Sequence, residues 1–399
     1  MKLEDLQNKK IAMLGLGIEN YALVKFLLKK KVKCEITICD ARSEKELGER
    51  YKKLAGKINP HTNFGVGVKW QLGGNFNKNL DKFDILFRSP GWPLDKVKNQ
   101  SRVLGTKIKN ILSSSMKLFF DLCPTKNIIG VTGTKGKGTT SSLIYHILKT
   151  AGKRARLSGR QVWLGGNIGV APFEFLNKIK KDDWVVLEMS SFQLEDMETS
   201  PHIAVITNFY KEHLSPADPN NPNYHKSLKE YRKAKENIFK WQNRNDFVIL
   251  NSNLKTQISK PQLKTKKLKS KIIYFTKSEL PSKLIGEHNK ENIAAAMAAA
   301  KIVGTKSIII KKAVAGFKGL EHRLEFAGRI KSPLPPLVKG GEICFYNDSF
   351  ATTPESAITA LKSFFAPIIL LAGGADKGAN FKNLAQEIKR RAKMAILLN

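Results

Sequence analysis

The sequence predicts an α/β protein of three domains with mostly parallel sheets. Three observations predict it. Short apolar runs alternate with amphipathic helical segments along most of the chain. Two glycine-rich turns, "GLGIEN" at 15–20 and "GTKGKG" at 133–138, each follow an apolar run and precede a helical pattern. A chain of 399 residues also exceeds one ordinary hydrophobic core.

Residues 1–114 form the expected N-terminal domain, which is Rossmann-like. A strand at 11–14, the first glycine turn, a helix at 21–29 and a strand at 36–39 follow one another and lead to Asp40. Asp40 lies about 20 residues beyond the glycines, where such folds contact a ribose. Asn20 replaces the third glycine, so a nucleotide other than NAD fits equally well. "FDILFRSPG", ending at Gly91, predicts a further strand and a tight turn.

Residues 115–319 form the expected central domain, which binds a mononucleotide through the second glycine turn. Its predicted strands include "WVVLE", ending at Glu188, and "IAVIT", ending near Asn208. A long helix is predicted around 224–242, and an alanine-rich helix follows "GEHNKEN". Ligands are expected at the carboxyl ends of these strands.

Residues 320–399 form the expected C-terminal domain, Rossmann-like and incomplete. The strands "FAGRI" and "ICFYNDS" are separated by a Pro/Gly-rich segment, which predicts a hairpin with a long loop. A helix at 355–364, the strand "IILLA", the loop "GGADKGANF", a further helix and the strand "MAILL" follow. Because no element comes after this last strand of a parallel sheet, the domain is expected to be truncated.

The net charge of +35 raises the alternative of a protein that associates with nucleic acid. Proteins that bind phosphates and bases favour arginine, but arginine supplies only 13 of the 69 basic residues here. The basic residues are spread along the whole chain. A general lysine bias explains the excess more simply, so small-molecule substrates are favoured over nucleic acid. A monomer is expected.

No apolar run approaches the about 18 residues of a membrane span, and the start lacks a signal-peptide core. The expected compartment is the cytoplasm, without a membrane partner. The four cysteines are scattered without a CxxC pair, which indicates neither a disulfide frame nor a zinc site. They are expected to be buried or half-buried thiols.

The stretch "GVTGTKGKGTTSS" at 130–142 departs from the usual phosphate loop at two positions. Val131 occupies the first glycine position, and Gly138 replaces the hydroxyl residue that normally follows the lysine. Lys137 can still place its ammonium group on phosphates held by backbone N–H groups and the helix dipole. Thr139 or Thr140 could supply the hydroxyl group for magnesium. A glycine turn without a ligand is the alternative, which the strand–loop–helix context disfavours.

Two polar residues follow neighbouring strand ends. Glu188 suits a magnesium ligand, directly or through water, because it ends a buried strand beside the phosphate loop. His213, just past the next strand, is a candidate metal ligand or polar contact. A capping or surface glutamate and a structural histidine are the alternatives for each residue taken alone.

Lys235 lies four residues after Tyr231 and three before Ile238, which places it on the apolar face of the predicted helix. Burial disfavours the charged ammonium and makes a neutral, nucleophilic amine available. Such an amine can take up carbon dioxide and become a carbamate. A lysine that snorkels at the edge of a core helix is the alternative.

Seven motifs together resemble the Mur ligase family over essentially the whole chain. They are "GTKGKGTT", "LEMSSFQLE", "NFYKEH", "YRKAK", "GEHNKEN", "HRLE" and "NDSFATT". "SSFQLE" and "GGNIG" at 165–169 most resemble the branch that adds D-glutamate to UDP-N-acetylmuramoyl-L-alanine in peptidoglycan precursor synthesis. A glycine after the loop lysine also resembles folylpolyglutamate synthase.

The resemblance implies an ATP-dependent ligase that works through an acyl phosphate, with two magnesium sites. It implies the catalytic residues Lys137, Glu188, His213 and carbamylated Lys235, and the metal ligands Thr139, Glu188, His213 and Lys235. It implies ATP contacts from Gly133, Thr134, Lys135, Gly136, Lys137, Gly138, Thr139, Thr140, Asn289, Asn292, Arg323 and Asp348. It implies UDP-sugar contacts from Ile18, Glu19, Asp40, Arg42, Ser89, Gly91, Asn167, Ser190 and Gln193, and amino-acid contacts from Thr352 and Lys377.

The chain departs from the family pattern at several of these positions. Glu19 stands where the family has a small or hydroxylated residue near the diphosphate, and its carboxylate would repel that group unless it turned away. Lys135 replaces the usual asparagine of the loop. Phe350 stands where a lysine commonly meets the D-glutamate carboxylates, which leaves Lys377 as the matching cation. Another Mur ligase, a folylpolyglutamate-synthase-like ligase and an inactive truncated remnant therefore stay open.

Overall fold

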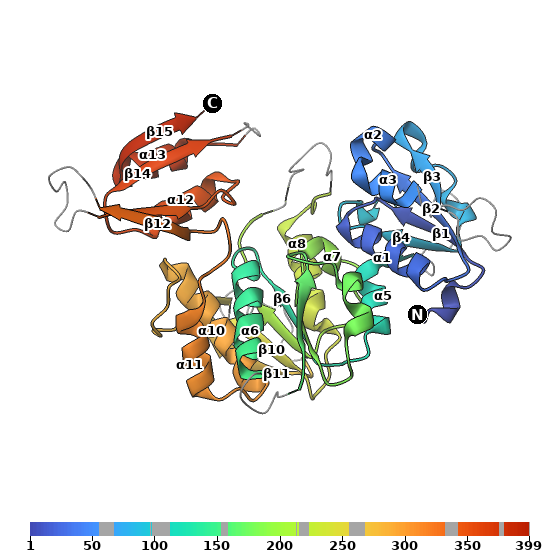
Figure 1. Cartoon of the computed structure of the whole chain (residues 1–399), viewed down its shortest axis with the longest axis horizontal. Coiled ribbons are helices and arrows are strands. Elements are labelled where there is room, and N and C mark those ends of the chain that lie inside the picture. Colours follow the sequence, from blue (N-terminus) through green and yellow to red (C-terminus); the bar gives the residue numbers. More distant parts are fainter. Residues whose placement is uncertain are drawn as a thin grey trace. The chain divides into compact units, whose positions relative to one another are not determined.

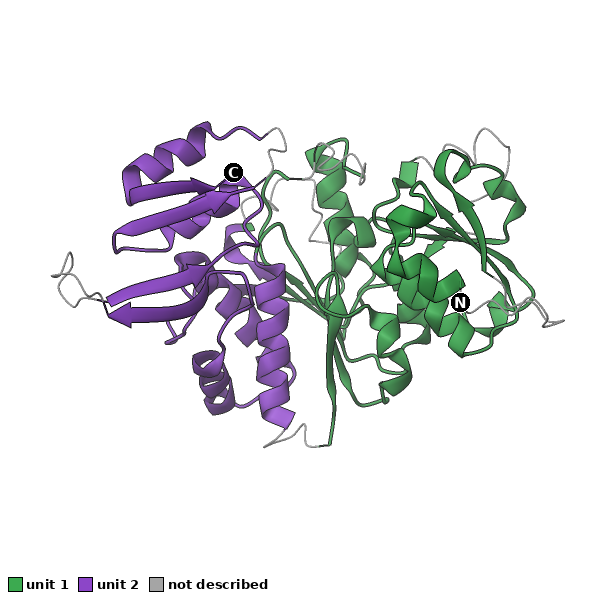
Figure 2. Cartoon of the chain, turned by 45° about the horizontal axis from the view of Figure 1, so that its top comes forward, with its two compact units in different colours: residues 1–135, 159–249, 254–273 green, residues 136–158, 250–253, 274–399 purple. Residues whose placement is uncertain are grey.

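The computed structural model describes residues 1–55, 68–95, 97, 112–152, 159–212, 214, 223–254, 268–331, 342–374 and 379–398. These residues form two compact units (Figure 2). Unit 1 contains residues 1–135, 159–249 and 254–273, and unit 2 contains residues 136–158, 250–253 and 274–399. Helices alternate with strands in both units, which confirms the α/β class. The division into three domains stays a prediction.

The first sheet of unit 1 has the strand order β3-β2-β1-β4-β5, and its neighbouring strands are parallel. The strands are β1 (Lys10–Leu14), β2 (Glu35–Asp40), β3 (Val68–Leu72), β4 (Ile85–Arg88) and β5 (Leu112–Ser114). This order confirms a Rossmann-like sheet, whose direction of winding reverses between β1 and β4. The carboxyl ends of those two strands therefore border the crevice where this fold class binds ligands.

Helix α1 (Ile18–Lys29) begins three residues earlier than the predicted start at Tyr21. The extended backbone of Gly17 ends the turn and precedes the helix directly. Two further helices, α2 (Glu44–Leu47) and α3 (Glu49–Ala55), follow β2. Ser43 begins α2 with a capping box, in which its side chain and that of Glu46 satisfy each other's backbone N–H groups.

Asn20 explains the imperfect glycine fingerprint. It is fully buried, and its Nδ2 donates to the carbonyl oxygens of Gly15 at 2.9 Å and Phe87 at 3.0 Å. A glycine at this position allows close packing of helix and strand, whereas the asparagine amide ties the turn to β4 by hydrogen bonds. The replacement therefore stabilises the same turn by different contacts.

The second sheet has the strand order β11-β10-β9-β6-β8-β7. Its strands are β6 (Ile128–Thr132), β7 (Val162–Gly166), β8 (Trp184–Glu188), β9 (Ile203–Ile206), β10 (Phe247–Asn251) and β11 (Lys271–Phe275). Strand β6 pairs in parallel with β8 on one side and β9 on the other. The helices of unit 1 that follow β5, β8 and β9 are α5 (Ser115–Leu122), α7 (Ser191–Leu194) and α8 (Leu228–Lys240).

Helix α8 is shorter than the predicted span of 224–242. Ser227 caps it by accepting a hydrogen bond from the backbone N–H of Glu230, and it ends at Lys240. Its apolar face is buried, and Tyr231, Lys235 and Ile238 lie on that face as the spacing predicts.

Unit 2 contains three helices that pack against one another, α6 (Lys137–Gly152), α10 (Glu287–Ile302) and α11 (Ser307–Gly316) (Figure 1). The buried alanines of α10 allow close approach to α6. Strands β12 (Glu325–Lys331) and β13 (Glu342–Asn347) pair antiparallel, as the hairpin prediction requires. Cys344 on β13 is exposed, so the prediction of a buried or half-buried thiol is wrong there, whereas Cys34, Cys39 and Cys123 are buried.

The remaining elements of unit 2 are α12 (Pro354–Lys362), β14 (Ile368–Gly373), α13 (Lys382–Arg391) and β15 (Ala392–Leu398). Strands β14 and β15 pair in parallel, and α12 packs against α13. Thr353 caps α12 by accepting a hydrogen bond from the N–H of Ser356. Within the described ranges, no helix is long and apolar enough to cross a membrane.

Candidate active site

The phosphate loop joins β6 to α6, and the boundary between the two units falls inside it, between Lys135 and Gly136. In unit 1 the end of β9 holds the loop backbone. The N–H of Lys135 donates to Asn208 Oδ1 at 2.8 Å, and Asn208 Nδ2 returns a hydrogen bond to the carbonyl oxygen of Lys135 at 3.0 Å. Thr207 Oγ1 donates to the same carbonyl at 2.6 Å. The sequence reasoning missed this support, although a Thr-Asn pair directly after an apolar strand was its signal.

Lys235 brings its amine to the same loop from helix α8. The residue is 3% exposed, so it does not snorkel to the surface. Its Nζ donates to the carbonyl oxygen of Gly133 at 2.8 Å and lies 4.7 Å from the centroid of the Tyr231 ring. Thr134 Oγ1 and the Tyr231 hydroxyl are 3.1 Å apart. Helix α8 therefore contacts the first half of the loop through Lys235 and Tyr231.

Glu188 ends β8 beside the loop strand, where its register partner on β6 is Val131. It is buried, and its Oε1 accepts a hydrogen bond from Asn167 Nδ2 at 2.7 Å. Among the residues the structure describes, none donates a hydrogen bond to Oε2. Because parallel strands end at one edge of the sheet, this carboxylate belongs to the same edge as the loop.

The second half of the loop rests on α10, within unit 2. Thr140 Oγ1 donates to Asn292 Oδ1 at 3.3 Å, and Asn292 Nδ2 donates to Asn289 Oδ1 at 2.9 Å. Both asparagines are buried. Lys137 is the first residue of α6 and is half-buried, while Gly138 and Thr139 follow it on the buried side. Asn289 and Asn292 thus support the loop helix, and contact with adenine stays a prediction.

Gly136 to alanine is expected to destabilise unit 2 by about 1–3 kcal/mol and to weaken ATP binding at least about tenfold. Gly136 has a φ of +79°, and a Cβ there would collide with the side-chain amide of Asn292. ATP titration by calorimetry and thermal unfolding would measure both effects. Gly73→Ala is the matched control, since Gly73 also has positive φ but has open space around a built Cβ. Equal ATP affinity in both variants would contradict the prediction.

The motifs "HRLE" and "NDSFATT" meet in unit 2. The Arg323 guanidinium lies 5.1 Å from the centroid of the Phe350 ring, and Asp348 Oδ1 accepts a hydrogen bond from the N–H of Leu324 at 3.0 Å. Burial raises the pKa of Asp348, partly offset by this hydrogen bond and by the Arg323 charge. Thr352 is exposed nearby in the sequence. Their roles in binding nucleotide and amino acid stay predictions, and His213 and Lys377 lie outside the described residues.

At the crevice of the first sheet, Asp40 holds the glycine turn. Its Oδ2 accepts the N–H of Leu16 at 2.7 Å, and its two oxygens form a bidentate pair with the Arg42 guanidinium at 2.7 and 2.9 Å. Burial alone would raise the pKa of Asp40, but these hydrogen bonds outweigh it and the pKa is lowered. Arg50, which the sequence reasoning missed, donates to the carbonyl oxygen of Leu16 at 2.9 Å.

Ser89 closes the crevice from β4. Gly15 has a φ of +84°, and a Cβ on it would lie 2.5 Å from Ser89 Oγ, so this approach requires glycine. Ile18 is 61% exposed at the start of α1, and Gly91 is half-buried. These residues lie around the point between β1 and β4 where the winding direction of the sheet reverses. Their contact with a UDP-sugar stays a prediction.

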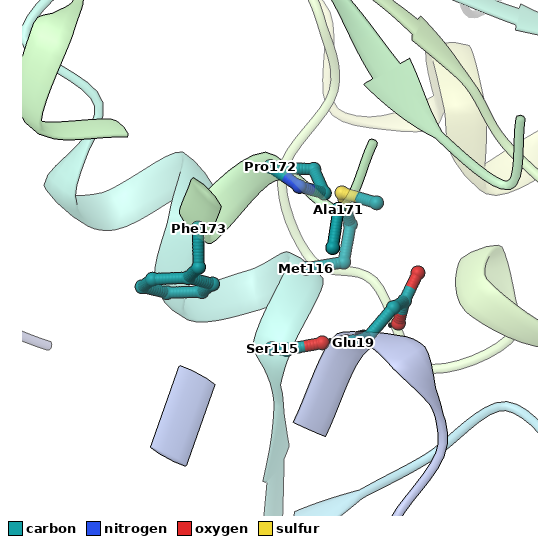
Figure 3. Close-up of a pocket in the computed structure, with 6 residues that line it drawn as sticks. All are labelled: Glu19, Ser115, Met116, Ala171, Pro172 and Phe173. Carbon is teal, nitrogen blue, oxygen red and sulfur yellow. Dashed lines mark hydrogen bonds between the residues drawn. The ribbon is translucent and has the colours of Figure 1, made fainter. Parts of the chain in front are cut away.

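Hydrogen bonds connect three other residues that are predicted to contact the UDP-sugar. The Gln193 side-chain amide donates to the carboxylate of Glu19, and the N–H of Gln193 donates to Ser190 Oγ at 3.2 Å. The carboxylate of Glu19 is therefore turned into the protein, beside Ser115 (Figure 3).

Magnesium is bound by oxygen ligands and commonly keeps several waters. Within the described part of the chain, no group of three or more His, Cys, Asp or Glu side chains is placed to hold a metal. The Glu188 carboxylate, in unit 1, and the Thr139 hydroxyl, in unit 2, are both oxygen donors of the chemical type that magnesium prefers. Their chemistry fits the ion that the family resemblance implies.

The parallel sheets and the phosphate loop between strand and helix are those of an α/β nucleotide-binding protein, and residues 131–279 match the Mur ligase middle domain. Over 98% of its length the chain is 37% identical to UDP-N-acetylmuramoylalanine–D-glutamate ligase of Clostridium tetani, and it covers 81% of that protein. It is 34% identical to the enzyme of the same name from Acetivibrio thermocellus, covering 80% of it. The chain belongs to the family of UDP-N-acetylmuramoylalanine–D-glutamate ligases.

Solved structures are similar in fold. UDP-N-acetylmuramate–alanine ligase MurC from Thermotoga maritima superimposes with a TM-score of 0.51 at 20% identity, over 98% of this chain and 90% of that one. MurF ligase from Thermotoga maritima in complex with ADP gives a TM-score of 0.52 at 16% identity, over 99% of this chain and 86% of that one. At these identities the likeness establishes the multi-domain parallel-sheet fold.

Proposed function

We propose that this protein is an ATP-dependent ligase that joins D-glutamate to UDP-N-acetylmuramoyl-L-alanine in peptidoglycan precursor synthesis. The observation that carries the proposal is the buried Lys235 amine on the Gly133 carbonyl, on a phosphate loop that also adjoins the Glu188 strand end. Relatives of 33–37% identity named for this reaction support it. A cytoplasmic location and a monomeric state belong to the same proposal.

Each chain group has a defined task in this proposal. Lys137 places its charge on the outer phosphates at the start of α6, and the backbone N–H groups of the loop hold the remaining oxygens. Glu188 and Thr139 offer oxygen ligands for Mg²⁺. When bound, ATP supplies the phosphoryl group that activates the substrate carboxylate as an acyl phosphate, and Mg²⁺ neutralises the charge that develops. The crevice around Ser89 and the Asp40-held turn would receive the UDP group.

The finer part of the proposal is that Lys235 carries a carbamate and serves a second metal site together with His213. A carbamate forms from a neutral amine and carbon dioxide, and the Lys235 amine is buried on the phosphate loop. A carbamate nitrogen keeps one N–H, so the bond to the Gly133 carbonyl can persist. The negative oxygens then add to the Glu188 carboxylate as ligands for a divalent cation.

The identity of the amino acid rests on the named relatives more than on local geometry. Phe350, at the position of the family lysine, is 59% exposed and lies beside the Arg323 guanidinium. Arg323 offers a cation where the lysine is absent, and Lys377 is the other candidate for the D-glutamate carboxylates. A panel of amino acids is therefore the decisive part of the test.

The test measures phosphate release from ATP by the purified chain with UDP-N-acetylmuramoyl-L-alanine and D-glutamate. We expect phosphate release to require both substrates. The matched control amino acids are L-glutamate, D-aspartate and L-lysine. Substrate whose terminal carboxylate carries oxygen-18 should transfer one labelled oxygen to the released phosphate, because the acyl phosphate forms at that carboxylate. Hydrolysis of ATP that is indifferent to both substrates would overturn the proposal, and release with another amino acid would reassign the substrate.

A further inference from the structure

Glu19 lies in the first turn of α1 with its carboxyl group buried. The residue is 9% exposed. Its Oε2 accepts a hydrogen bond from the Ser115 hydroxyl at the start of α5, at 3.1 Å, and its Oε1 accepts one from the Gln193 amide in α7. Figure 3 shows Glu19 and Ser115 next to each other. The hollow that they line with four other residues has no room for a water molecule, and both oxygens of the carboxyl group contact protein side chains.

Gln193 is fixed at both ends of its side-chain amide. Its Oε1 accepts the N–H of Ser190 at 2.6 Å, and its Nε2 donates to Glu19. If the amide were reversed, its NH₂ group would face the backbone N–H of Ser190, and two donors would oppose each other. The NH₂ group therefore faces Glu19, which must present an acceptor oxygen. Through this amide, the position of Glu19 sets the first turn of α7.

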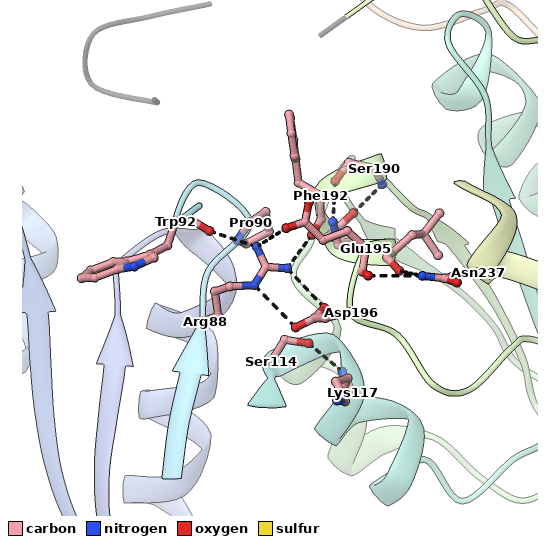
Figure 4. A network of polar contacts seen from close by, with 12 residues as sticks. Arg88, Pro90, Trp92, Ser114, Lys117, Ser190, Phe192, Glu195, Asp196 and Asn237 are labelled. Atoms are coloured by element: carbon pink, nitrogen blue, oxygen red, sulfur yellow. Dashed lines mark hydrogen bonds and ion pairs between the residues drawn. The ribbon is translucent and has the colours of Figure 1, made fainter. Parts of the chain in front are cut away.

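Arg88 holds the same short helix from β4 (Figure 4). Its Nη2 donates to the carbonyl oxygen of Phe192 at 2.8 Å, and its guanidinium pairs with Glu195 at 3.4 Å and Asp196 at 3.2 Å. Helix α7 starts directly after Glu188 and Ser190. The glycine turn of the first sheet and the carboxylate strand end of the second sheet are therefore joined through α7, with Glu19 on the turn side.

Given the ligase function proposed above, we propose that Glu19 is a positioning residue for the ligation. Through the Gln193 amide, Glu19 aligns α7 with the glycine turn that receives the UDP group. The strand end at Glu188 and Ser190, which directly precedes α7, is aligned together with it.

The surroundings of Glu19 favour a neutral carboxyl group. Burial raises the pKa of Glu19, and the Asp196 charge adds to it, while the hydrogen bonds from Gln193 and Ser115 and the Arg88 charge offset part of the rise. Arg88 already faces two other carboxylates, Glu195 and Asp196. The Ser115 hydroxyl can accept as well as donate, so a proton on Oε2 keeps both contacts. Glutamine at position 19 reproduces this arrangement, with Oε1 accepting from Gln193 and Nε2 donating to Ser115.

The test compares steady-state kinetics of wild-type protein with Glu19→Ala, Glu19→Gln and Lys25→Gln. We expect Glu19→Ala to lower kcat/KM for the UDP-sugar by about 10- to 100-fold, since a misplacement of about 1 Å costs about this much. KM for ATP should stay within about twofold, and Glu19→Gln should retain activity within about threefold. Lys25→Gln removes a partly exposed ion pair between α1 and Glu174 and should match wild type.

Because the folded-state pKa of Glu19 is raised, its stabilising contribution is complete below the unfolded value of 4.5 and is lost as the pH rises through the folded pKa. Glu19→Gln has no such ionisation. We therefore expect its unfolding midpoint, relative to wild type, to increase as the pH rises. A constant difference across the pH range would show that Glu19 does not sit as a neutral bridge and would overturn the inference.

A double-mutant cycle of Glu19→Ala and Gln193→Ala in kcat/KM separates positioning from independent effects. If Glu19 acts through Gln193, the double variant should lose no more than the worse single variant. Additive losses would overturn the inference, as would wild-type kinetics in Glu19→Ala or an equal loss in Glu19→Gln. A wild-type protein that releases no phosphate with any amino acid would instead overturn the proposed function. In that case the same double-mutant cycle is carried out with the affinity for the UDP-sugar as the measured quantity. Additive losses of affinity would again overturn the inference.

Discussion

Replacing Arg88 by methionine is expected to lower the free energy of unfolding of unit 1 by about 3–5 kcal/mol. Arg88 is 1% exposed, and the side chains of its partners Glu195 and Asp196 are 12% and 8% exposed. Methionine fills much of the arginine volume, so the loss arises mainly from removal of the positive charge beside the half-buried Glu195 and Asp196 and of the N–H donors to the carbonyl oxygens of Trp92 and Phe192.

Tryptophan fluorescence in a urea titration measures this loss, because all five tryptophans belong to unit 1. Lys69→Met is the control in the same unit: Lys69 and its partner Glu35 are 65% and 41% exposed, and an exposed pair contributes at most about 1 kcal/mol. Adding Glu195→Gln and Asp196→Asn to Arg88→Met should restore part of the stability. A loss no greater than that of the control would show that the cluster carries no net stabilisation.

The Arg88 cluster also shows where sequence reasoning stops. The run "FDILFRSPG" predicts β4 and its turn correctly, because apolar residues of a strand covered on both faces form a continuous run. The same run does not predict the ion-pair partners of Arg88, since Asp196 lies 108 residues further along the chain. A charge at a strand end is usually solvated. Its partners follow from the packing of α7, which no local pattern encodes.

Local signals explain a second difference. Ser190 and Gln193 were predicted to contact the UDP-sugar on resemblance alone, yet the spacing S-x-x-Q is that of a capping box, and the structure has one there. Their contact with substrate remains a prediction. Conversely, the helical spacing around Lys235 correctly placed it on the apolar face of α8, because a period of 3.6 residues determines which face packs inward, but it left open a lysine that snorkels to the surface, which the structure does not have. Periodicity predicts burial, but it could not identify the Gly133 carbonyl as the acceptor.

Lys235→Ala is expected to lower kcat for ligation by at least about 100- to 1,000-fold, the usual effect of removing one group that stabilises developing charge. The amine is buried on the phosphate loop, 2.8 Å from the carbonyl oxygen of Gly133, so alanine removes both that contact and the site of the proposed carbamate. Lys233→Ala is the matched control, because Lys233 is an exposed lysine on the same helix and should leave kcat unchanged. Unfolding midpoints of both variants would confirm that each is folded.

The carbamate itself has a separate readout. Short carboxylic acids should restore part of the activity of Lys235→Ala by supplying the missing carboxylate, and wild-type protein in ¹³C-bicarbonate should give a carbamate carbon signal that the variant lacks. Loss of activity without rescue and without that signal would leave the amine essential but refute the carbamate. Undiminished activity in Lys235→Ala would contradict any role for this side chain, because no other buried lysine of the described residues lies on the loop. The two results therefore separate a chemical role of the lysine from a purely structural contact with the loop.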